Sequence, residues 1–267
     1  MINIRSLLVV VLASLVGACA GMSTKPAPAT RAELAPTGAL RVGIFTGNPV
    51  IANKNKATGE LSGTTVALGK ALAGQSGVEF VPVEYTAIAK LVEDAKTGAW
   101  DIAVVAYDPA RRTILDYAPP HMTVDLTYLV APGSSIQKVP DADQPGVRIA
   151  VARGAATGLL LERTLKQASV VAADNEPAAF DLVREGKAQA YAQNRYMLLG
   201  LAQSLPGARV LDDRFAAVEL AFALPKGRPA ALTYVSAFVE QAKTSGAVER
   251  AIESAGLRGV RVAAVAQ

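Results

Sequence analysis

Polar side chains suited to ligand binding follow two strand-like segments, one in each half of the chain. Asp108 and Arg111 follow the almost continuously apolar segment 101–106. In the second half, segment 189–192 is followed by three polar residues, Gln193, Asn194 and Arg195. Ligands of open α/β sheets bind beyond the carboxyl ends of the strands. We therefore expect these two groups to face each other across a cleft.

A third candidate element is the loop 153–158, which precedes a predicted helix. Free amide groups at a helix N-terminus attract anions. Thr157 is either the N-cap of that helix or a ligand donor, and Gly154 could be a plain turn. Arg153 and Arg195, if they face the cleft, would favour a ligand with more than one acidic group.

Residues for catalysis or metal binding are scarce. His121 is the single histidine and Cys19 the single cysteine. They cannot supply a Ser-His-Asp set, a metal-ligand cluster or an internal disulfide, so we expect no catalytic residues, metal or cofactor. The 27 Lys and Arg residues are spread along the chain against 23 Asp and Glu, which gives no support for nucleic-acid binding.

Strand-like and helix-like segments alternate from residue 38 onward, in two similar units. The first has strands at 40–45, 78–85 and 101–106 and helices at 65–74 and 88–97. The second has strands at 146–151, 169–172 and 189–192 and helices at 157–167, 176–185 and 196–204; strand 218–224 and helices 230–245 and 248–255 follow. Continuous apolar strands that alternate with helices predict α/β lobes with parallel-rich sheets flanked by helices.

The N-terminus reads as an export signal, assigned to residues 1–18. The apolar run 7–16 is too short to span a bilayer but suits a signal-peptide core. Residues 16–19 (VGAC) resemble the lipobox of bacterial lipoproteins, which predicts lipidation at Cys19 and a membrane anchor. Alternatively, ordinary signal peptidase cuts at the small residues around Cys19 and removes it. Residues 19–37, rich in Ala, Pro and Thr, are predicted to be an extended tether outside the cytoplasm.

The order of several short motifs resembles the family 3 periplasmic solute-binding proteins of ABC transporters. The motifs are LRVG at 40–43, TGELSG at 58–63, GAWDI at 98–102, PAR at 109–111, DYAP at 116–119, LVREG at 182–186 and ALPKG at 223–227. The resemblance covers most of the chain after residue 38.

The resemblance implies a two-lobed periplasmic-binding-protein fold of type II. Lobe 1 would comprise 38–131 and 219–262, and lobe 2 would be the inserted segment 132–218. The two crossings would form a hinge, and closure of the lobes around the ligand would be read by a membrane permease. The implied function is capture of a small carboxylate-bearing solute, an amino acid or organic acid, by a monomeric periplasmic protein that serves an ABC importer.

The resemblance also implies roles for individual residues. Arg111 matches the family arginine that takes the ligand carboxylate, a task suited to a planar guanidinium; the alternative is a surface arginine that caps the next helix. Asn194 aligns with the family aspartate that pairs with an α-ammonium group. Because asparagine carries no charge, the ligand need not be an amino acid.

Asp108 stands where the family usually has Thr or Ser. It could receive a cationic group, pair with Arg111 in the empty site, or act as a helix N-cap before Pro109. Ala106, Phe45 and Tyr107 complete the predicted ligand-binding set. The two aromatic residues could stack on a ligand, although each is more often part of a core.

Two alternatives to transport remain. Some relatives of this fold, such as periplasmic cyclohexadienyl dehydratases, use cleft carboxylates in elimination chemistry, and Asp108 would then be the general acid or base. The other alternative is an accessory lipoprotein whose pocket binds nothing. Aromatic residues that the family commonly has are missing here from segments 46–51 and 63–65, which would fit this alternative, whereas retention of Arg111 argues against it.

Overall fold

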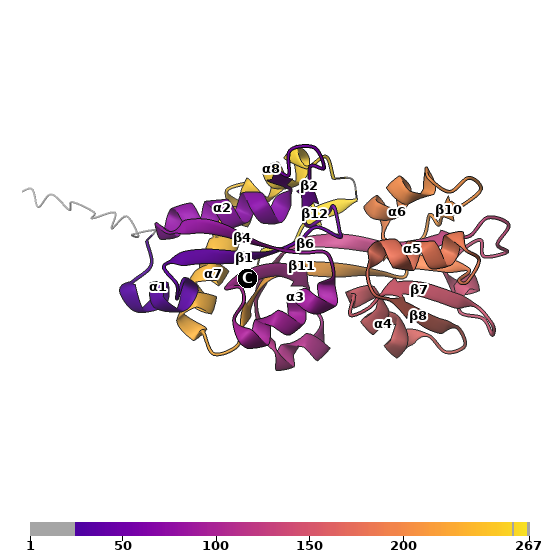
Figure 1. Cartoon of the computed structure of the whole chain (residues 1–267), viewed down its shortest axis with the longest axis horizontal. Helices are drawn as coiled ribbons and strands as arrows, with labels where there is room; N and C mark the ends of the chain where they lie inside the picture. Colours follow the sequence, from indigo (N-terminus) through magenta and orange to yellow (C-terminus); the bar gives the residue numbers. More distant parts are fainter. Residues whose placement is uncertain (1–24, 258, 266–267) are drawn as a thin grey trace, which may run out of the picture.

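The protein folds into two α/β lobes that lie side by side along its longest axis (Figure 1). The structure, a computed structural model, describes residues 25–257 and 259–265. The predicted signal peptide and Cys19 lie outside the described residues.

The main strands and helices of lobe 1 are β1 (Ala39–Phe45), β4 (Glu79–Tyr85), β5 (Ile102–Ala106), α1 (Pro28–Leu34), α2 (Thr64–Ser76), α3 (Ile88–Asp94), α7 (Pro229–Thr244) and α8 (Ala247–Ser254). Short elements complete it: the hairpin of β2 (Asn53–Lys54) and β3 (Leu61–Ser62), strand β12 (Val260–Val262), and the 3₁₀ helices η1 (Ala95–Thr97) and η2 (Pro109–Thr113).

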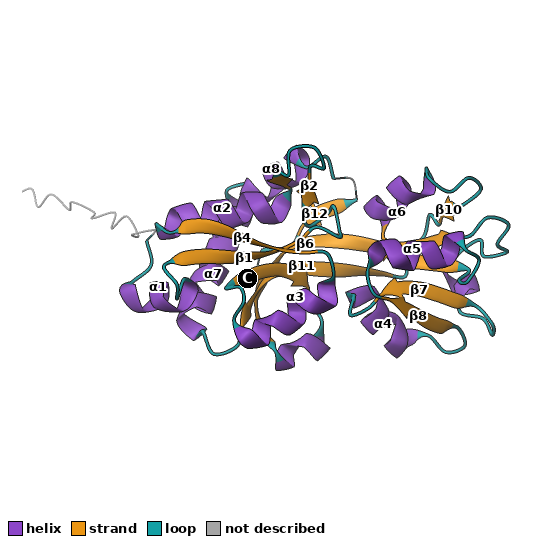
Figure 2. Cartoon of the chain, viewed as in Figure 1, coloured by secondary structure: helices purple, strands orange, loops and turns teal. Residues whose placement is uncertain are grey.

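Lobe 2 repeats the same plan on a smaller scale. Its elements are β7 (Arg148–Ala152), β8 (Ser169–Ala173), β9 (Ala190–Asn194), β10 (Arg209–Val210), α4 (Ala156–Thr164), α5 (Glu176–Arg184), α6 (Arg195–Ala202) and the 3₁₀ helix η3 (Val139–Ala142). Helices flank the strands in both lobes (Figure 2).

Two long strands join the lobes, β6 (Leu115–Val130) and β11 (Ala216–Pro225). The main sheet runs in the order β4-β1-β5-β11-β6-β9-β7-β8. The pairs of β1 with β4 and β5, and of β7 with β8 and β9, are parallel, whereas β6 and β11 pair antiparallel. The predicted two-lobed fold with parallel-rich sheets is therefore confirmed.

The crossing from one lobe to the other occurs at Leu126. This residue pairs with Ala216 of β11 on one side and with Asn194 of β9 on the other. Asn194 is thus placed at the seam between the lobes by backbone pairing alone.

Each lobe has its own apolar core. The core of lobe 1 is built around the fully buried Trp100 and includes Phe45 and Phe222. Lobe 2 has two clusters, one with Tyr128 and Val151 and one with Tyr191. Because successive strand residues point to opposite faces, these clusters cover the two sides of the lobe 2 sheet.

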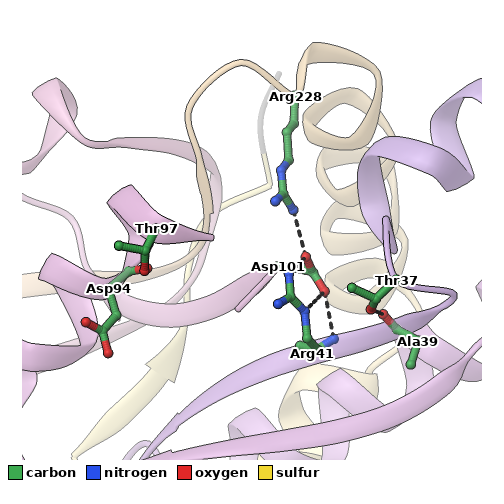
Figure 3. Close-up of polar contacts among 7 residues, drawn as sticks. All are labelled: Thr37, Ala39, Arg41, Asp94, Thr97, Asp101 and Arg228. Carbon is green, nitrogen blue, oxygen red and sulfur yellow. Dashed lines mark hydrogen bonds and ion pairs between the residues drawn. The ribbon is translucent and has the colours of Figure 1, made fainter. Parts of the chain in front are cut away.

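A buried ion cluster fixes the elements of lobe 1 that carry the site (Figure 3). Asp101, directly before β5, is fully buried and pairs with Arg41 of β1 at 2.7 Å and with Arg228, before α7, at 2.9 Å. A buried carboxylate is tolerated when it is paired and hydrogen-bonded in this way. The cluster anchors the start of β5, whose far end leads to Asp108 and Arg111.

The segment predicted as an extended tether differs from that expectation in its second half. Pro28–Leu34 forms α1, and Leu34 is fully buried in the lobe 1 core. Glu33 accepts hydrogen bonds from the free N–H groups of Ala230 and Ala231 at the start of α7. Capping of one helix by a residue far away in the sequence gives no local sequence signal.

Candidate functional site

A cavity of about 50 Å³ lies between the lobes, at the carboxyl ends of β5 and β9. Phe45, Asn48 and Arg111 line it from lobe 1, and Thr157, Glu176 and Asn194 from lobe 2. Apolar residues of the crossing strands, such as Leu126 and Leu220, also line it. The cavity therefore lies where the strand-end argument predicted a cleft.

Arg111 is buried, with 4% of its surface exposed. Its Nη1 donates to the carbonyl of Ala106 at 2.9 Å, and its Nη2 donates across the lobe boundary to the carbonyl of Gly154 at 2.6 Å. Burial lowers the pKa of Arg111, and its interactions with Tyr117 and Asp108 partly oppose this. Arg111 makes no salt bridge within the described residues, so its positive charge is not neutralised by an adjoining carboxylate.

The loop between β7 and α4 brings Thr157 into the cavity. The N-cap of α4 is Ala155, so Thr157 lies inside the first turn and is not the cap. Its Oγ1 is buried and has no hydrogen-bond partner among the described residues. Thr157 is thus free to donate to or accept from a ligand.

Gly154 serves as a close contact between the lobes. Its φ of +71° is in the left-handed region, and an added Cβ would lie 3.1 Å from the Cβ of Ala89 on α3. Any other side chain at this position would strain the backbone and would require Ala89 to shift by a few tenths of an ångström.

Asn194 lines the cavity, but its amide group already has protein partners. Its Oδ1 caps α6 by accepting from the N–H of Met197 at 2.8 Å. Its Nδ2 donates to Gln193 Oε1 and, across the lobe boundary, to Asn48 Oδ1 at 3.1 Å. Asn194 therefore acts in this structure as a cap and as a bridge between lobes.

Asp108 lies outside the cavity lining. It is the N-cap of η2, accepting from the N–H of Ala110 at 2.8 Å, and it pairs with Arg163 of α4 in lobe 2 at 2.8 Å. Burial alone would raise the pKa of Asp108, but the hydrogen bonds from Arg163 and Ala110 outweigh it and the pKa is lowered. Of the alternatives weighed from the sequence, the N-cap is present, and the cation is Arg163 instead of Arg111.

The other predicted site residues divide between the cavity and its surroundings. Ala106 and Phe45 line the cavity. Tyr107 is partly exposed and lies beside Asp108 in a separate surface hollow. Arg153 pairs with Asp174 on the surface, and Arg195 donates to three backbone carbonyls of residues 211–213. Neither arginine lines the cavity, because each guanidinium has partners within its own lobe.

Glu176 lines the cavity and was not singled out from the sequence. It is the first residue of α5, is 2% exposed, and its Oε2 has no partner among the described residues. Burial raises its pKa to about 7. An acidic residue in the first turn of a helix is common, so nothing in the sequence distinguishes Glu176 from an ordinary helix start.

Two other kinds of feature are absent from the described part of the chain. No group of histidine, cysteine and acidic residues there is arranged to hold a metal ion. No helix within residues 25–257 and 259–265 is long and apolar enough to cross a membrane.

Comparison with known proteins decides the family. The model of the bacterial extracellular solute-binding proteins, family 3, matches residues 40–255. The chain belongs to this family. Membership agrees with the resemblance deduced from the motifs and implies a location outside the cytoplasm.

Individual relatives of this solute-binding protein are distant. The glutamine-binding protein of Geobacillus stearothermophilus is 23% identical over 67% of this chain and 69% of its own length. The ABC transporter glutamine-binding protein GlnH of Bacillus subtilis is 20% identical over 76% of each chain. The crystal structure of AncCDT-1, an ancestral amino acid-binding protein described as a precursor of cyclohexadienyl dehydratase, is 28% identical. It superposes with a TM-score of 0.71 over 84% of this chain and 98% of that one.

Proposed function

We propose that this protein captures a small carboxylate-bearing solute in the cavity between its lobes and delivers it to an ABC importer. The observation that carries the proposal is Arg111, a buried cation that lines the cavity and lacks a salt-bridge partner among the described residues. A guanidinium has five N–H donors, and backbone carbonyls occupy only some of them here. A ligand carboxylate would complete the hydrogen bonding and neutralise the charge.

Thr157 and the start of α4 supply the second part of the carboxylate site. The first N–H groups of a helix lack partners within it, and they point toward the N-terminal end. Thr157 lies in this first turn with its Oγ1 unpaired. In this arrangement lobe 1 supplies the cation and lobe 2 the neutral donors, so the carboxylate would join the lobes.

Delivery to an importer rests on the relatives, since one of them carries the name of an ABC transporter component. Export, lipidation at Cys19 and a monomeric state belong to the same proposal. They agree with the leader-like sequence of residues 1–19 and with the family.

A thermal-shift panel on the purified protein tests the proposal, with α-amino acids, dicarboxylates, keto acids and phenolic acids as probes. A ligand at a hundred times its dissociation constant adds about 2.7 kcal/mol to the free energy of unfolding, which raises the melting temperature by several degrees. We expect Arg111→Ala to abolish the shift and Arg112→Ala, which changes the exposed neighbour, to preserve it. An unchanged shift in Arg111→Ala, with circular dichroism confirming the fold, would discard the site.

Elimination chemistry is a second candidate, and one observation favours it. Departure of a hydroxyl group as water needs a general acid with a pKa near the working pH. The lowered pKa of Asp108 makes it unsuitable, whereas Glu176 combines a pKa of about 7 with a place in the cavity lining. Incubation with a cyclohexadienyl carboxylate, followed by ultraviolet absorbance of the aromatic product, distinguishes the two functions. Turnover that is lost in Glu176→Gln would support the enzyme, and binding without turnover would support the transporter component.

A further inference from the structure

Glu176 is a buried carboxyl group without a counter-ion. Its Oε2 has no hydrogen-bond partner in the described part of the chain, although 98% of the residue is shielded from water. Acidic side chains are almost never fully buried unless they are paired, because desolvation of the charge is costly. The protein thus retains at this place a group that its own side chains do not satisfy.

The position of Glu176 directs this group at the cavity and at lobe 1. Asn175 caps α5 by accepting from the N–H of Ala178 at 3.0 Å, which fixes Glu176 in the first turn. A Cβ added to Gly47, in the loop after β1, would lie 3.2 Å from Glu176 Oε2. The carboxyl group therefore reaches the boundary between the lobes, where a ligand would be enclosed.

Asn194 is at the position expected to contact a ligand ammonium group, but its side chain already has hydrogen-bond partners within the protein. Its Oδ1 caps α6, and its Nδ2 donates to Gln193 and Asn48. A neutral side chain with both ends engaged cannot supply the negative charge that an ammonium group requires. Glu176 is the acidic residue that lines the cavity in the structure described here.

The other side chains that line the cavity limit the uncharged part of the ligand. They are largely apolar, such as those of Phe45, Val50, Ile51, Ile88, Val124 and Leu126. The cavity is small, at about 50 Å³, so it favours a compact ligand. A compact apolar ligand body therefore suits this lining better than a polar one.

We propose that Glu176 determines the specificity of the cleft by accepting hydrogen bonds from the ammonium group of a small, apolar amino-carboxylate whose carboxylate is held by Arg111. This inference rests on the proposed function, because it assigns the other end of the same ligand. The site then presents one cation and one anion to a zwitterion.

Proton linkage is a consequence of this assignment. Since burial raises the pKa of Glu176 to about 7, about half of the molecules carry a proton on Glu176 at pH 7. An ammonium group favours the ionised form, so binding releases that proton. The charged or titratable groups around Glu176 are Arg111 across the cavity, Tyr191 on the adjoining β9, and the surface pair Arg153 and Asp174 before α5.

Isothermal titration calorimetry with a matched pair of probes tests the inference. L-Valine and isovalerate differ only in the ammonium group, and each is titrated at pH 7 in phosphate and in Tris to obtain the number of protons released. We expect wild type to prefer L-valine and to release about half a proton on binding it. Glu176→Gln should weaken L-valine binding about tenfold or more and abolish the release, with little effect on isovalerate.

Glu162→Gln, which changes an exposed carboxylate of α4 in the same lobe, is the control and should behave as wild type. Thermal melting without ligand checks that Glu176→Gln folds. Equal binding of both probes by wild type, or L-valine binding and proton release unchanged in Glu176→Gln, would overturn the inference. Failure of both probes on wild type would overturn the ligand class, while Arg111-dependent binding of another carboxylate would leave the proposed function in place.

Discussion

Arg111 and Glu176 line the same cavity, yet the sequence pointed to one and not to the other. Arg111 follows a buried strand and matches a family motif, two independent signals at one position. Glu176 has neither, and its acidic side chain suits the start of any helix. Glu176 is distinguished by a carboxyl oxygen that is buried without a partner among the described residues. This burial depends on Gly47 and the cavity walls, which enclose the side chain. Such enclosure is a property of tertiary structure.

The raised pKa of Glu176 predicts that the ligand-free protein loses stability as the pH rises. In the unfolded chain Glu176 ionises near its ordinary pKa of 4.5, whereas in the folded protein it holds its proton until about pH 7. Between these pH values the folded state therefore binds more protons than the unfolded state. The stabilisation that this proton provides is lost as the pH rises through the range. The difference amounts to a loss on the order of 3 kcal/mol between about pH 4.5 and pH 8.

Urea unfolding at several pH values measures this effect at the level of the single residue. Glu176→Gln cannot ionise, so its free energy of unfolding should gain on that of wild type as the pH rises, while Glu162→Gln should follow wild type. If the difference between wild type and Glu176→Gln is constant from pH 5 to pH 8, Glu176 is not protonated in the folded protein.

At the scale of elements, the strands and helices of both α/β units agree with the predicted segments to within a few residues, because their apolar periodicity is set locally. The long strand β6 was not predicted. It contains Pro119 and Pro120, and proline within a segment argues against a central strand. The structure accommodates them with shifts of register where β6 pairs with β11, between Leu220 and Ala223.

His121 in the middle of β6 packs against the neighbouring strand β11. It is fully buried, its ring stacks on Phe222 of β11 at 5.2 Å, and neither ring nitrogen has a partner among the described residues. Burial lowers its pKa to about 3, and the charge of Lys243 lowers it further. The unfolded chain takes up a proton here below about pH 6.5 and the folded chain does not, so stability falls as the pH drops from 6.5.

The substitution His121→Phe should remove this acid sensitivity while keeping an aromatic ring against Phe222. Relative to wild type at the same pH, we expect its free energy of unfolding to gain about 2 kcal/mol between pH 6.5 and pH 4.5. Comparison at equal pH matters because Glu176 has the opposite trend in this range. Equal acid dependence in both proteins, measured by urea unfolding, would mean that His121 is protonated in the folded state.

At the scale of the whole molecule, the two similar units of alternating strands and helices and the two sets of strand ends were sufficient to predict two lobes and a cleft. The contacts that hold the lobes together were not predictable. Arg163 lies inside a helix whose orientation toward Asp108 depends on how the lobes pack. The same holds for the bond from Arg111 to Gly154 and for that from Asn194 to Asn48.

The pair of Asp108 and Arg163 joins the lobes without any ligand, and we predict that it favours the closed arrangement. Arg163 donates to both oxygens of Asp108, at 2.8 and 3.3 Å, but its side chain is 47% exposed. Solvent screening limits such a pair to about 1 kcal/mol, which corresponds to a roughly fivefold change in the ratio of closed to open molecules. Arg163→Gln removes the charge and should raise both the radius of gyration of the ligand-free protein and the apparent dissociation constant, the latter by up to about fivefold.

Small-angle X-ray scattering and ligand titration measure the two effects, with Arg184→Gln as the control, since Arg184 pairs with Asp181 within one helix of lobe 2. The two variants remove the same charge from the same lobe, so a change confined to Arg163→Gln reports the contact between lobes. Saturating ligand should restore the wild-type radius in Arg163→Gln, because ligand binding energy then replaces the lost pair in holding the lobes together. Unchanged scattering and affinity would mean that the cavity contacts of Arg111 and Asn194 are sufficient to keep the lobes closed.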